Sequence, residues 1–211
     1  MATSFSNQID TIVNLMTRLA PSRVLDIGKG FGKYGFLLHE YYGIDNNTKP
    51  DATKTLAQQS RVTIDAVECN QDYLWPHIAQ FYSRVFVGRI EDMYLNLHGY
   101  DTVLMLDVIE HLQPSYGKAI IEHFIYEGST MVISTPNVFF NQELYDSPEE
   151  HHVSFWGPGE MSALGFPFDY QTVGLGRVFL ISSSTLDIRG FGHSSIKRLR
   201  RIARSVINEL H

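Results

Sequence analysis

The sequence Val24-Leu-Asp-Ile-Gly-Lys-Gly-Phe-Gly-Lys-Tyr-Gly35 joins a short apolar run to a loop with glycines at positions 28, 30 and 32. Glycine tolerates positive φ and lets the backbone approach a ligand closely, so the pattern predicts a buried strand, a tight turn and the start of a helix. The part from Gly30 to Gly35 also matches the dinucleotide fingerprint G-x-G-x-x-G, which is weak evidence when taken alone. The stretch therefore predicts a ligand-binding turn in an α/β fold and leaves the ligand open.

Asp26 narrows the choice of ligand. It lies at the end of the predicted strand, where its carboxylate would repel a pyrophosphate seated on the N-terminus of the following helix. The same carboxylate would attract a ligand that carries a cationic amino group. The loop therefore favours a cationic nucleotide-like ligand and makes a nicotinamide oxidoreductase a distant alternative.

On both sides of this loop, apolar runs alternate with stretches of helical periodicity. The predicted strands cover residues 23–28, 62–68, 84–88, 100–107 and 130–135, and the predicted helices cover residues 5–20, 33–42, 71–82 and 114–126. A short helix at residues 159–164 and a terminal hairpin from residues 170–174 and 177–183 follow. Strands and helices that alternate at this pitch predict a parallel sheet with right-handed crossovers.

The composition is typical of a globular protein. The chain has 211 residues, of which 44% are hydrophobic and 19% are charged, and this length suits a single domain over residues 1–211. It contains no apolar run of the roughly 18 residues that a membrane span needs and no visible secretory signal, so we expect a cytoplasmic protein. The single cysteine, Cys69, excludes an internal disulfide and a cysteine-based zinc site.

Charge is distributed unevenly along the chain. Residues 194–211 hold five basic side chains and one acid, which leaves 12 basic and 22 acidic side chains in the first 193 residues. An acidic body argues against a protein that binds nucleic acid through a broad basic face. The last segment has apolar residues at helical spacing, and we predict a basic C-terminal helix that docks on the body. Contact with a membrane surface or with nucleic acid is the alternative.

Acidic residues follow the glycine loop at the ends of the later predicted strands. In chain order they are Glu68 after the second strand, Glu91-Asp92 after the third and Asp107 after the fourth. Together with Asp26-x-Gly28-x-Gly30-x-Gly32, this order resembles the class I S-adenosylmethionine-dependent methyltransferases over about residues 20 to 185. Three later stretches resemble the small-molecule O-methyltransferase branches of that family, and they are Ser134-Thr-Pro-Asn137, His152-x-x-Phe155 and Leu164-Gly-Phe166.

The resemblance implies a fold, a cofactor and a set of contacts. The fold is Rossmann-like, with a seven-stranded mostly parallel sheet, helices on both faces and an antiparallel last strand. The cofactor is S-adenosylmethionine (SAM), whose demethylated product is S-adenosylhomocysteine (SAH). Glu68 is expected to hold the ribose hydroxyls, and Asp92, which is preferred to Glu91, is expected to hold the adenine amino group with Met93 beside the ring. The remaining expected cofactor contacts are Asp26, Gly28, Gly30, Gly32 and Asp107.

Two features depart from the family pattern. Asp26 and Glu68 lie 42 residues apart, where roughly 20 is usual, and we assign the surplus to a polar insertion at residues 43–61 with one short helix. Lys29 adds a cation to the loop beside a positively charged cofactor. We expect it to leave cofactor affinity unaffected if its side chain points to solvent.

The acceptor is predicted to bind under residues 137–158. This long segment follows the fifth predicted strand and is rich in aromatic residues, so we expect a lid whose aromatic wall shields the sulfonium. Its aromatic residues include Phe139, Phe140, Tyr145, Phe155 and Trp156. A hydroxyl acceptor benefits from a base of near-neutral pKa, which favours His152, with His111 behind it. Five of the remaining histidines are expected at the surface, and they are His39, His77, His98, His123 and His193.

The predicted function is methyl transfer from SAM to a hydroxyl of a small molecule or sugar-containing metabolite, with nucleic acid an unlikely partner and no metal. One alternative is a metal site, because Glu110, His111 and the distant His152 resemble the magnesium ligands of RNA 3′-end 2′-O-methyltransferases. A divalent cation there would lower the pKa of a bound hydroxyl, although Asp107 replaces the first glutamate of that motif. The other alternative is a protein that binds SAM without catalysing transfer.

Overall fold

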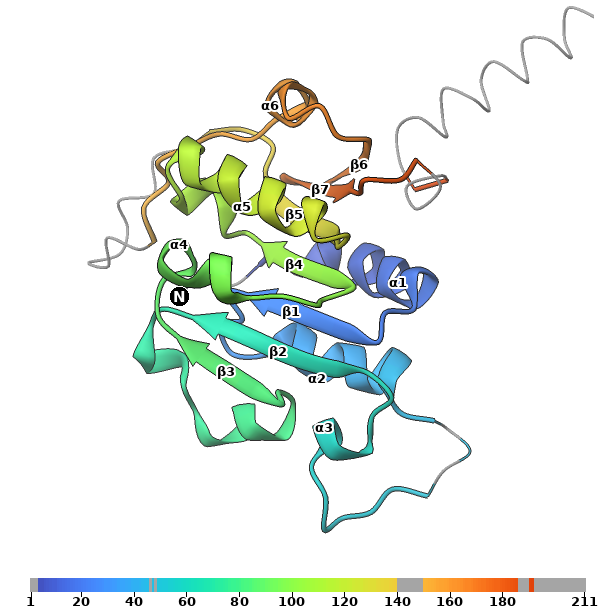
Figure 1. Cartoon of the computed structure of the whole chain (residues 1–211). Coiled ribbons are helices and arrows are strands. Elements are labelled where there is room, and N and C mark those ends of the chain that lie inside the picture. Colours follow the sequence, from blue (N-terminus) through green and yellow to red (C-terminus); the bar gives the residue numbers. More distant parts are fainter. Residues whose placement is uncertain (1–3, 46, 48, 140–149, 186–189, 192–211) are drawn as a thin grey trace, which may run out of the picture.

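The computed structural model describes residues 4–45, 47, 49–139, 150–185 and 190–191. At its centre is a seven-stranded sheet in the order β3-β2-β1-β4-β5-β7-β6 (Figure 1). The strands are β1 Arg23–Ile27, β2 Thr63–Glu68, β3 Arg84–Val87, β4 Thr102–Leu106, β5 Thr130–Pro136, β6 Phe168–Val173 and β7 Gly176–Ile181. Strands β1 to β5 pair in parallel, whereas β7 is antiparallel to both of its neighbours, β5 and β6. The predicted Rossmann-like sheet with an antiparallel last strand is confirmed.

Helices lie on both faces of this sheet (Figure 1). The α-helices are α1 Ile9–Leu19, α2 Lys33–Leu38, α3 Leu56–Gln59, α4 Ile90–Met93, α5 Pro114–Tyr126 and α6 Pro158–Ala163. The 3-10 helices are η1 Ser6–Gln8, η3 Gln71–Tyr73, η4 Pro76–Gln80, η5 Tyr94–Asn96 and η6 Ile109–His111, and η2 His39–Gly43 is a π-helix. The predicted helix at residues 5–20 is therefore η1 followed by α1, which ends at Ala20 in the left-handed conformation just before Pro21.

Two hydrophobic cores form because side chains alternate across each strand. In β4, Val103 and Met105 pack into the core under α5, while Leu104 and Leu106 pack into the core under α1 and α2. Every residue of β4 is buried, as expected for a strand that is covered on both faces. This packing fixes the carboxyl ends of the central strands, where the candidate site lies.

The helix predicted at residues 71–82 is wrong. The side chain of Asn70 caps the short turn η3 by accepting a hydrogen bond from the N–H of Asp72 at 2.9 Å. Pro76 then starts a separate turn, η4, after an extended Trp75. Proline lacks an N–H and disfavours a helical conformation in the residue before it, so one continuous helix cannot form here.

The surface prediction for the histidines is wrong at His39. That side chain is fully buried, its Nε2 lies 2.7 Å from the carbonyl oxygen of Phe81, and burial lowers its pKa. His77 and His123 are half-buried against carbonyl oxygens, and His98 is exposed and lies 3.2 Å from Glu127. His193 lies outside the described residues.

The predicted insertion at residues 43–61 contains one short helix, α3, as expected. A reciprocal capping box between Thr55 and Gln58 defines its start. The predicted basic helix at residues 194–211 lies outside the described residues and stays a prediction. Within the described part of the chain, no helix is both long enough and apolar enough to cross a membrane.

Candidate functional site

A cavity of about 300 Å³ lies at the carboxyl edge of the sheet. Its walls come from the glycine loop after β1 and from the residues that follow β2, β3 and β4. The N-terminal residues Ser4 and Phe5 and the later residues Glu150 and His152 complete its lining. This edge is where ligands of open α/β folds bind.

The glycine loop needs its glycines. Gly28, Gly30 and Gly32 have φ values of 71°, 52° and 81°, which favour glycine. A Cβ at Gly28 would overlap with the side chain of Val108. The loop can therefore bring its backbone to the cavity only with glycine at these positions.

Asp26 lies beneath the loop and lines the cavity. It is 3% exposed, and its Oδ2 accepts a hydrogen bond of 2.6 Å from the hydroxyl of Tyr82. Burial raises the pKa of Asp26 to about 6, although the Tyr82 hydrogen bond opposes that shift. A cation placed beside this carboxylate would favour its ionised form.

Glu68 holds the loop in place before any ligand is considered. Its Oε2 accepts the N–H of Gly30 and its Oε1 accepts the N–H of Asn70, both at 2.9 Å. Burial raises the pKa of this carboxyl, and the two backbone hydrogen bonds oppose that shift. Because each carboxylate oxygen has two lone pairs, Glu68 keeps the capacity to accept further hydrogen bonds from a diol.

Lys29 is buried rather than directed to solvent, with 6% of its surface exposed. Its Nζ donates to the carbonyl oxygens of Gly30 and Tyr73, both at 2.9 Å. Burial lowers the pKa of Lys29, and the nearby charges of Glu68 and Asp26 oppose that shift. The cation thus joins the glycine loop to the segment after β2 and is balanced by two acids.

The residues expected to contact the adenine do not line the cavity. Arg89, Ile90 and Glu91 line the cavity, whereas Asp92 is exposed and Met93 packs against the hydrophobic core. The reason is the phase of α4, which buries Ile90 and turns Asp92 to solvent. Glu91, in an ion pair of 2.8 Å with Arg89, is therefore the acid that this segment brings to the cavity.

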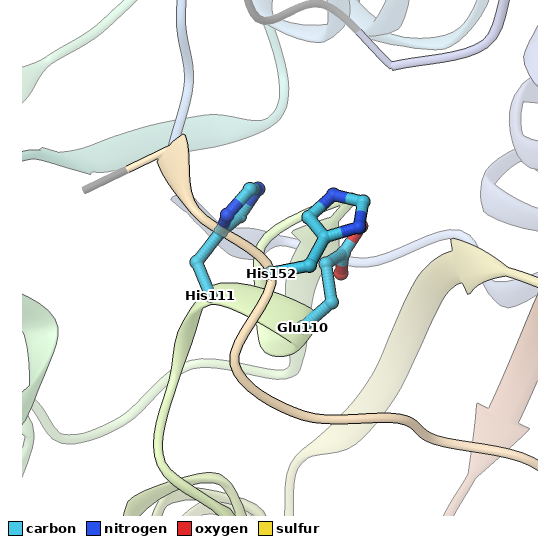
Figure 2. Close-up of side chains that lie close together, drawn as sticks. All are labelled: Glu110, His111 and His152. Carbon is cyan, nitrogen blue, oxygen red and sulfur yellow. The ribbon is translucent and has the colours of Figure 1, made fainter. Parts of the chain in front are cut away.

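Glu110, His111 and His152 also line the cavity, and they lie close together (Figure 2). One ligand atom from each lies within 4.8 Å of the others, and the two imidazole rings are 5.0 Å apart. Nδ1 of His111 lies 3.1 Å from the carbonyl oxygen of His151, so the neutral ring carries its proton on Nδ1 and presents Nε2 as an acceptor. Burial lowers the pKa of His111, which favours this neutral form.

Glu110 and Asp107 are the buried acids beside these histidines. Oε2 of Glu110 is buried and has no hydrogen-bond partner among the described residues, and burial raises its pKa well above the usual range, with a further increase from the charge of Asp107. Asp107 accepts hydrogen bonds from the hydroxyl of Ser134 at 2.9 Å and from the N–H of Phe5 at 3.1 Å. It lines the cavity but is not part of the group formed by Glu110 and the histidines.

The lid prediction can be compared with the structure only at residues 137–139 and 150–158, because residues 140–149 lie outside the described part. After His152, the N–H groups of Val153 and Ser154 donate to the carbonyl oxygen of Glu110 at 2.8 and 3.0 Å. This contact holds the segment against the turn that carries Glu110 and His111.

The expected aromatic wall is not at the cavity where it can be compared. Phe139 and Phe155 are exposed, and Trp156 is buried in the hydrophobic core beside Gly117. Phe140 and Tyr145 lie outside the described residues. The aromatic residues that line the cavity are Phe5, Phe31, Tyr34 and Tyr73.

Several cavity residues were missed by sequence reasoning. Lys33 and Tyr34 directly follow the glycine loop, and the first turn of the helix would have placed them at its mouth. Tyr73 and Glu150 carry no sequence signal of this kind, since their place at the cavity depends on how two irregular segments meet.

No family model and no curated protein matches this sequence. Solved structures with similar folds include an O-methyltransferase family protein from Burkholderia thailandensis (TM-score 0.56, 14% identity, 84% of this chain and 56% of that chain). A second is the N-terminal domain of EvdMO1 in the presence of SAH and D-fucose (TM-score 0.56, 11% identity, 85% of this chain and 83% of that chain). A third is the small RNA methyltransferase HEN1 (TM-score 0.59, 17% identity, 86% of this chain and 26% of that chain). This chain therefore spans little more than half of the first protein and about a quarter of the last. It has the fold of the class I S-adenosylmethionine-dependent methyltransferases.

Proposed function

We propose that this protein transfers a methyl group from SAM to a hydroxyl of a small molecule or sugar-containing metabolite. The observation that carries the proposal is one cavity lined by two chemically different groups of residues. The first group is the glycine loop with Asp26 and Glu68, and the second is the pair of imidazoles of His111 and His152.

The glycine loop, Asp26 and Glu68 suit SAM. Asp26 provides a carboxylate for a cationic group, Glu68 provides oxygens for a diol, and the backbone of Gly28 and Gly30 forms a wall without side chains. Lys29 does not oppose this use, because its ammonium is already directed to two carbonyl oxygens. When bound, SAM supplies a methyl group that its sulfonium activates for in-line displacement.

The imidazoles of His111 and His152 suit a hydroxyl acceptor. A neutral imidazole can accept the proton that the hydroxyl loses, and general-base catalysis of this kind contributes roughly 10² to 10⁴ in rate. We assign that role to His152, with His111 behind it. Correct placement of the acceptor supplies the rest of the rate.

A second candidate function is metal-assisted methylation of an RNA 3′ end. It is favoured by the close approach of Glu110, His111 and His152 and by the buried Oε2 of Glu110. One carboxylate and two imidazoles can hold a divalent cation, which would lower the pKa of a hydroxyl bound to it. The acidic body of the chain favours the small-molecule acceptor.

The test begins with cofactor binding and continues to transfer. SAH should raise the melting temperature of the purified protein, whereas NAD should not. With isotopically labelled SAM and a metabolite extract, mass spectrometry should then reveal a labelled O-methylated product. SAH binding without transfer to any metabolite or RNA would identify a non-catalytic binding protein.

Variants separate the base from the metal. His152→Ala should lower turnover by roughly 10² to 10⁴ and leave SAH affinity unchanged. If a metal acts instead, chelation and add-back of divalent ions will control activity, and the Glu110 and His111 variants will behave alike. Full turnover by His152→Ala would exclude both roles of that residue.

A further inference from the structure

We propose that Glu150 recognises the acceptor, and that the acceptor therefore carries a second hydroxyl or amino group near the methylated oxygen. This inference rests on the proposed methyl transfer and names the chemical class of its substrate. Glu150 is two residues before His152 in the chain, and both side chains line the cavity. A group that Glu150 holds would thus lie close to the proposed base.

The two oxygens of the Glu150 carboxyl differ in their surroundings. Oε1 accepts a hydrogen bond of 2.8 Å from the hydroxyl of Tyr73. Oε2 is buried and has no hydrogen-bond partner among the described residues, and the residue as a whole is 8% exposed. The carboxyl is therefore held through one oxygen, while its other oxygen is an unpaired acceptor in a residue that lines the cavity.

An unpaired acceptor in this position calls for a donor. A buried polar atom without a partner is destabilising, whereas hydrogen bonds to charged groups are among the strongest in proteins. A hydroxyl or ammonium on the acceptor supplies the missing N–H or O–H. An aliphatic group or a phosphate oxygen supplies none.

Other contacts hold Tyr73 in place beside Glu150. The Tyr73 carbonyl oxygen accepts a hydrogen bond from Lys29 at 2.9 Å, and its ring packs edge-on against Phe31 at a centroid distance of 4.8 Å. These contacts orient the hydroxyl that holds Oε1 of Glu150. Because Oε2 is buried, binding a donor there requires the carboxylate to turn toward the cavity while Tyr73 keeps its hydrogen bond to Oε1.

The charges of the cavity point to the same class of acceptor. Its lining includes the acids Asp107, Glu110 and Glu150, and Lys33 lies close enough to Asp107 for their charges to interact. The Lys33 Nζ already donates to the backbone oxygen and the hydroxyl of Ser4, at 2.7 and 3.0 Å. Donor-rich neutral or cationic molecules, such as polyols and amino alcohols, fit these surroundings better than phosphorylated ones.

The test uses the labelled product of the transfer assay and analogues of its acceptor, in which one hydroxyl or amino group at a time is replaced by hydrogen. In Glu150→Gln, Tyr73 retains the remaining oxygen, so the amide presents a donor to the cavity. We expect kcat/KM for the full acceptor to fall by roughly 10- to 100-fold, mainly through KM, with SAH affinity unchanged. Glu122→Gln, on α5 and outside the lining of the cavity, is the matched control.

The analogues decide whether the loss arises at Oε2. The analogue that lacks the group held by Glu150 should have a kcat/KM with the native protein that is lower than that of the full acceptor by the same factor. With Glu150→Gln, this analogue and the full acceptor should have equal kcat/KM, because the substitution and the analogue each remove the same contact. The inference would be overturned if, for every analogue, the loss in kcat/KM from the analogue multiplied the loss from Glu150→Gln. It would also be overturned if Glu150→Gln kept the native kcat/KM for the full acceptor. Either result would leave the proposed methyl transfer intact. A phosphorylated product without a free hydroxyl or amino group would also overturn it. SAH binding with no labelled product would overturn the transfer and the inference together.

Discussion

Replacing Glu68 by alanine is expected to weaken SAH binding and also to destabilise the unliganded protein. Both effects follow from the position of one carboxyl between two segments and a cavity. Its oxygens accept N–H groups from Gly30 and Asn70 at 2.9 Å each. They also face the space that we assign to the ribose of the cofactor.

The expected loss of affinity comes from the hydrogen bonds that the ribose diol would donate. A hydrogen bond to a charged group contributes about 1.5 to 3 kcal/mol, and every 1.4 kcal/mol corresponds to about a factor of ten in Kd. Glu68→Ala should therefore raise the Kd of SAH by roughly 10- to 100-fold.

The expected loss of stability is smaller than two full hydrogen bonds. Each N–H left without a partner costs about 1 to 3 kcal/mol when it is buried, but Gly30 and Asn70 are only half-buried, so water can replace the lost acceptor. Alanine also removes the desolvation that raises the pKa of Glu68. We expect the free energy of unfolding to fall by about 2 kcal/mol.

Titration calorimetry with SAH and urea unfolding measure the two effects separately. Glu68→Gln serves as an isosteric variant, since its amide keeps one acceptor oxygen and replaces the other by a donor. A native Kd in Glu68→Ala would remove this residue from the cofactor site. Unchanged stability would refute its role in holding the loop.

Three further changes test the site and the chain around it. Burial raises the pKa of Asp26 to about 6, so the folded protein binds more protons than the unfolded chain between about pH 4 and 6 and loses stability as pH rises through that window. Asp26→Asn should remove the contribution of this carboxyl to the decline, about 3 kcal/mol, in urea unfolding at a series of pH values. Gly28→Ala should destabilise the protein by about 1 to 3 kcal/mol, because its Cβ overlaps with Val108 at a positive φ, and calorimetry should show a lower melting temperature. Truncation after Ser194 should also lower the melting temperature, because the apolar residues of the predicted helix would lose their packing.

Each of these expectations has a result that contradicts it. A native pH dependence in Asp26→Asn would mean that another group titrates in that window. Gly28→Ala with native stability would show that the loop can move away from Val108, and Val108→Ala should partly rescue the variant if it cannot. An unchanged melting temperature after truncation, together with lost binding to liposomes or RNA, would exclude docking of the tail.

The parts of the fold that were predictable from sequence are those set by local patterns. β4 is apolar throughout its centre because it is covered on both faces, and the glycine loop requires its residues at positive φ. The predicted helix at residues 71–82 failed because Asn70 and Pro76, two single residues, override the periodicity around them. Asp92 was preferred to Glu91 although the choice depends on the phase of one short helix, α4.

The contents of the cavity were less predictable because they depend on tertiary contacts. Trp156 lies in an aromatic stretch but packs into the core, where Gly117 leaves space for its ring. Glu150 lies in the same region of sequence and reaches the cavity through its contact with Tyr73, which is distant in the chain. No periodicity distinguishes these two outcomes.

The hydrogen bonds of the cavity acids also determine which variants are informative. Asp26, Glu68 and Asp107 each accept hydrogen bonds that join separate segments of the chain. Changes at these positions will alter folding and ligand binding together, so a loss of activity alone does not identify a ligand contact. Glu110 and Glu150 each have a buried carboxyl oxygen without a partner among the described residues. Glu150→Gln retains one oxygen for the Tyr73 hydrogen bond that joins two distant segments, and Glu110→Gln keeps the shape of its side chain, so we expect these changes to disturb folding less than changes at the other three acids.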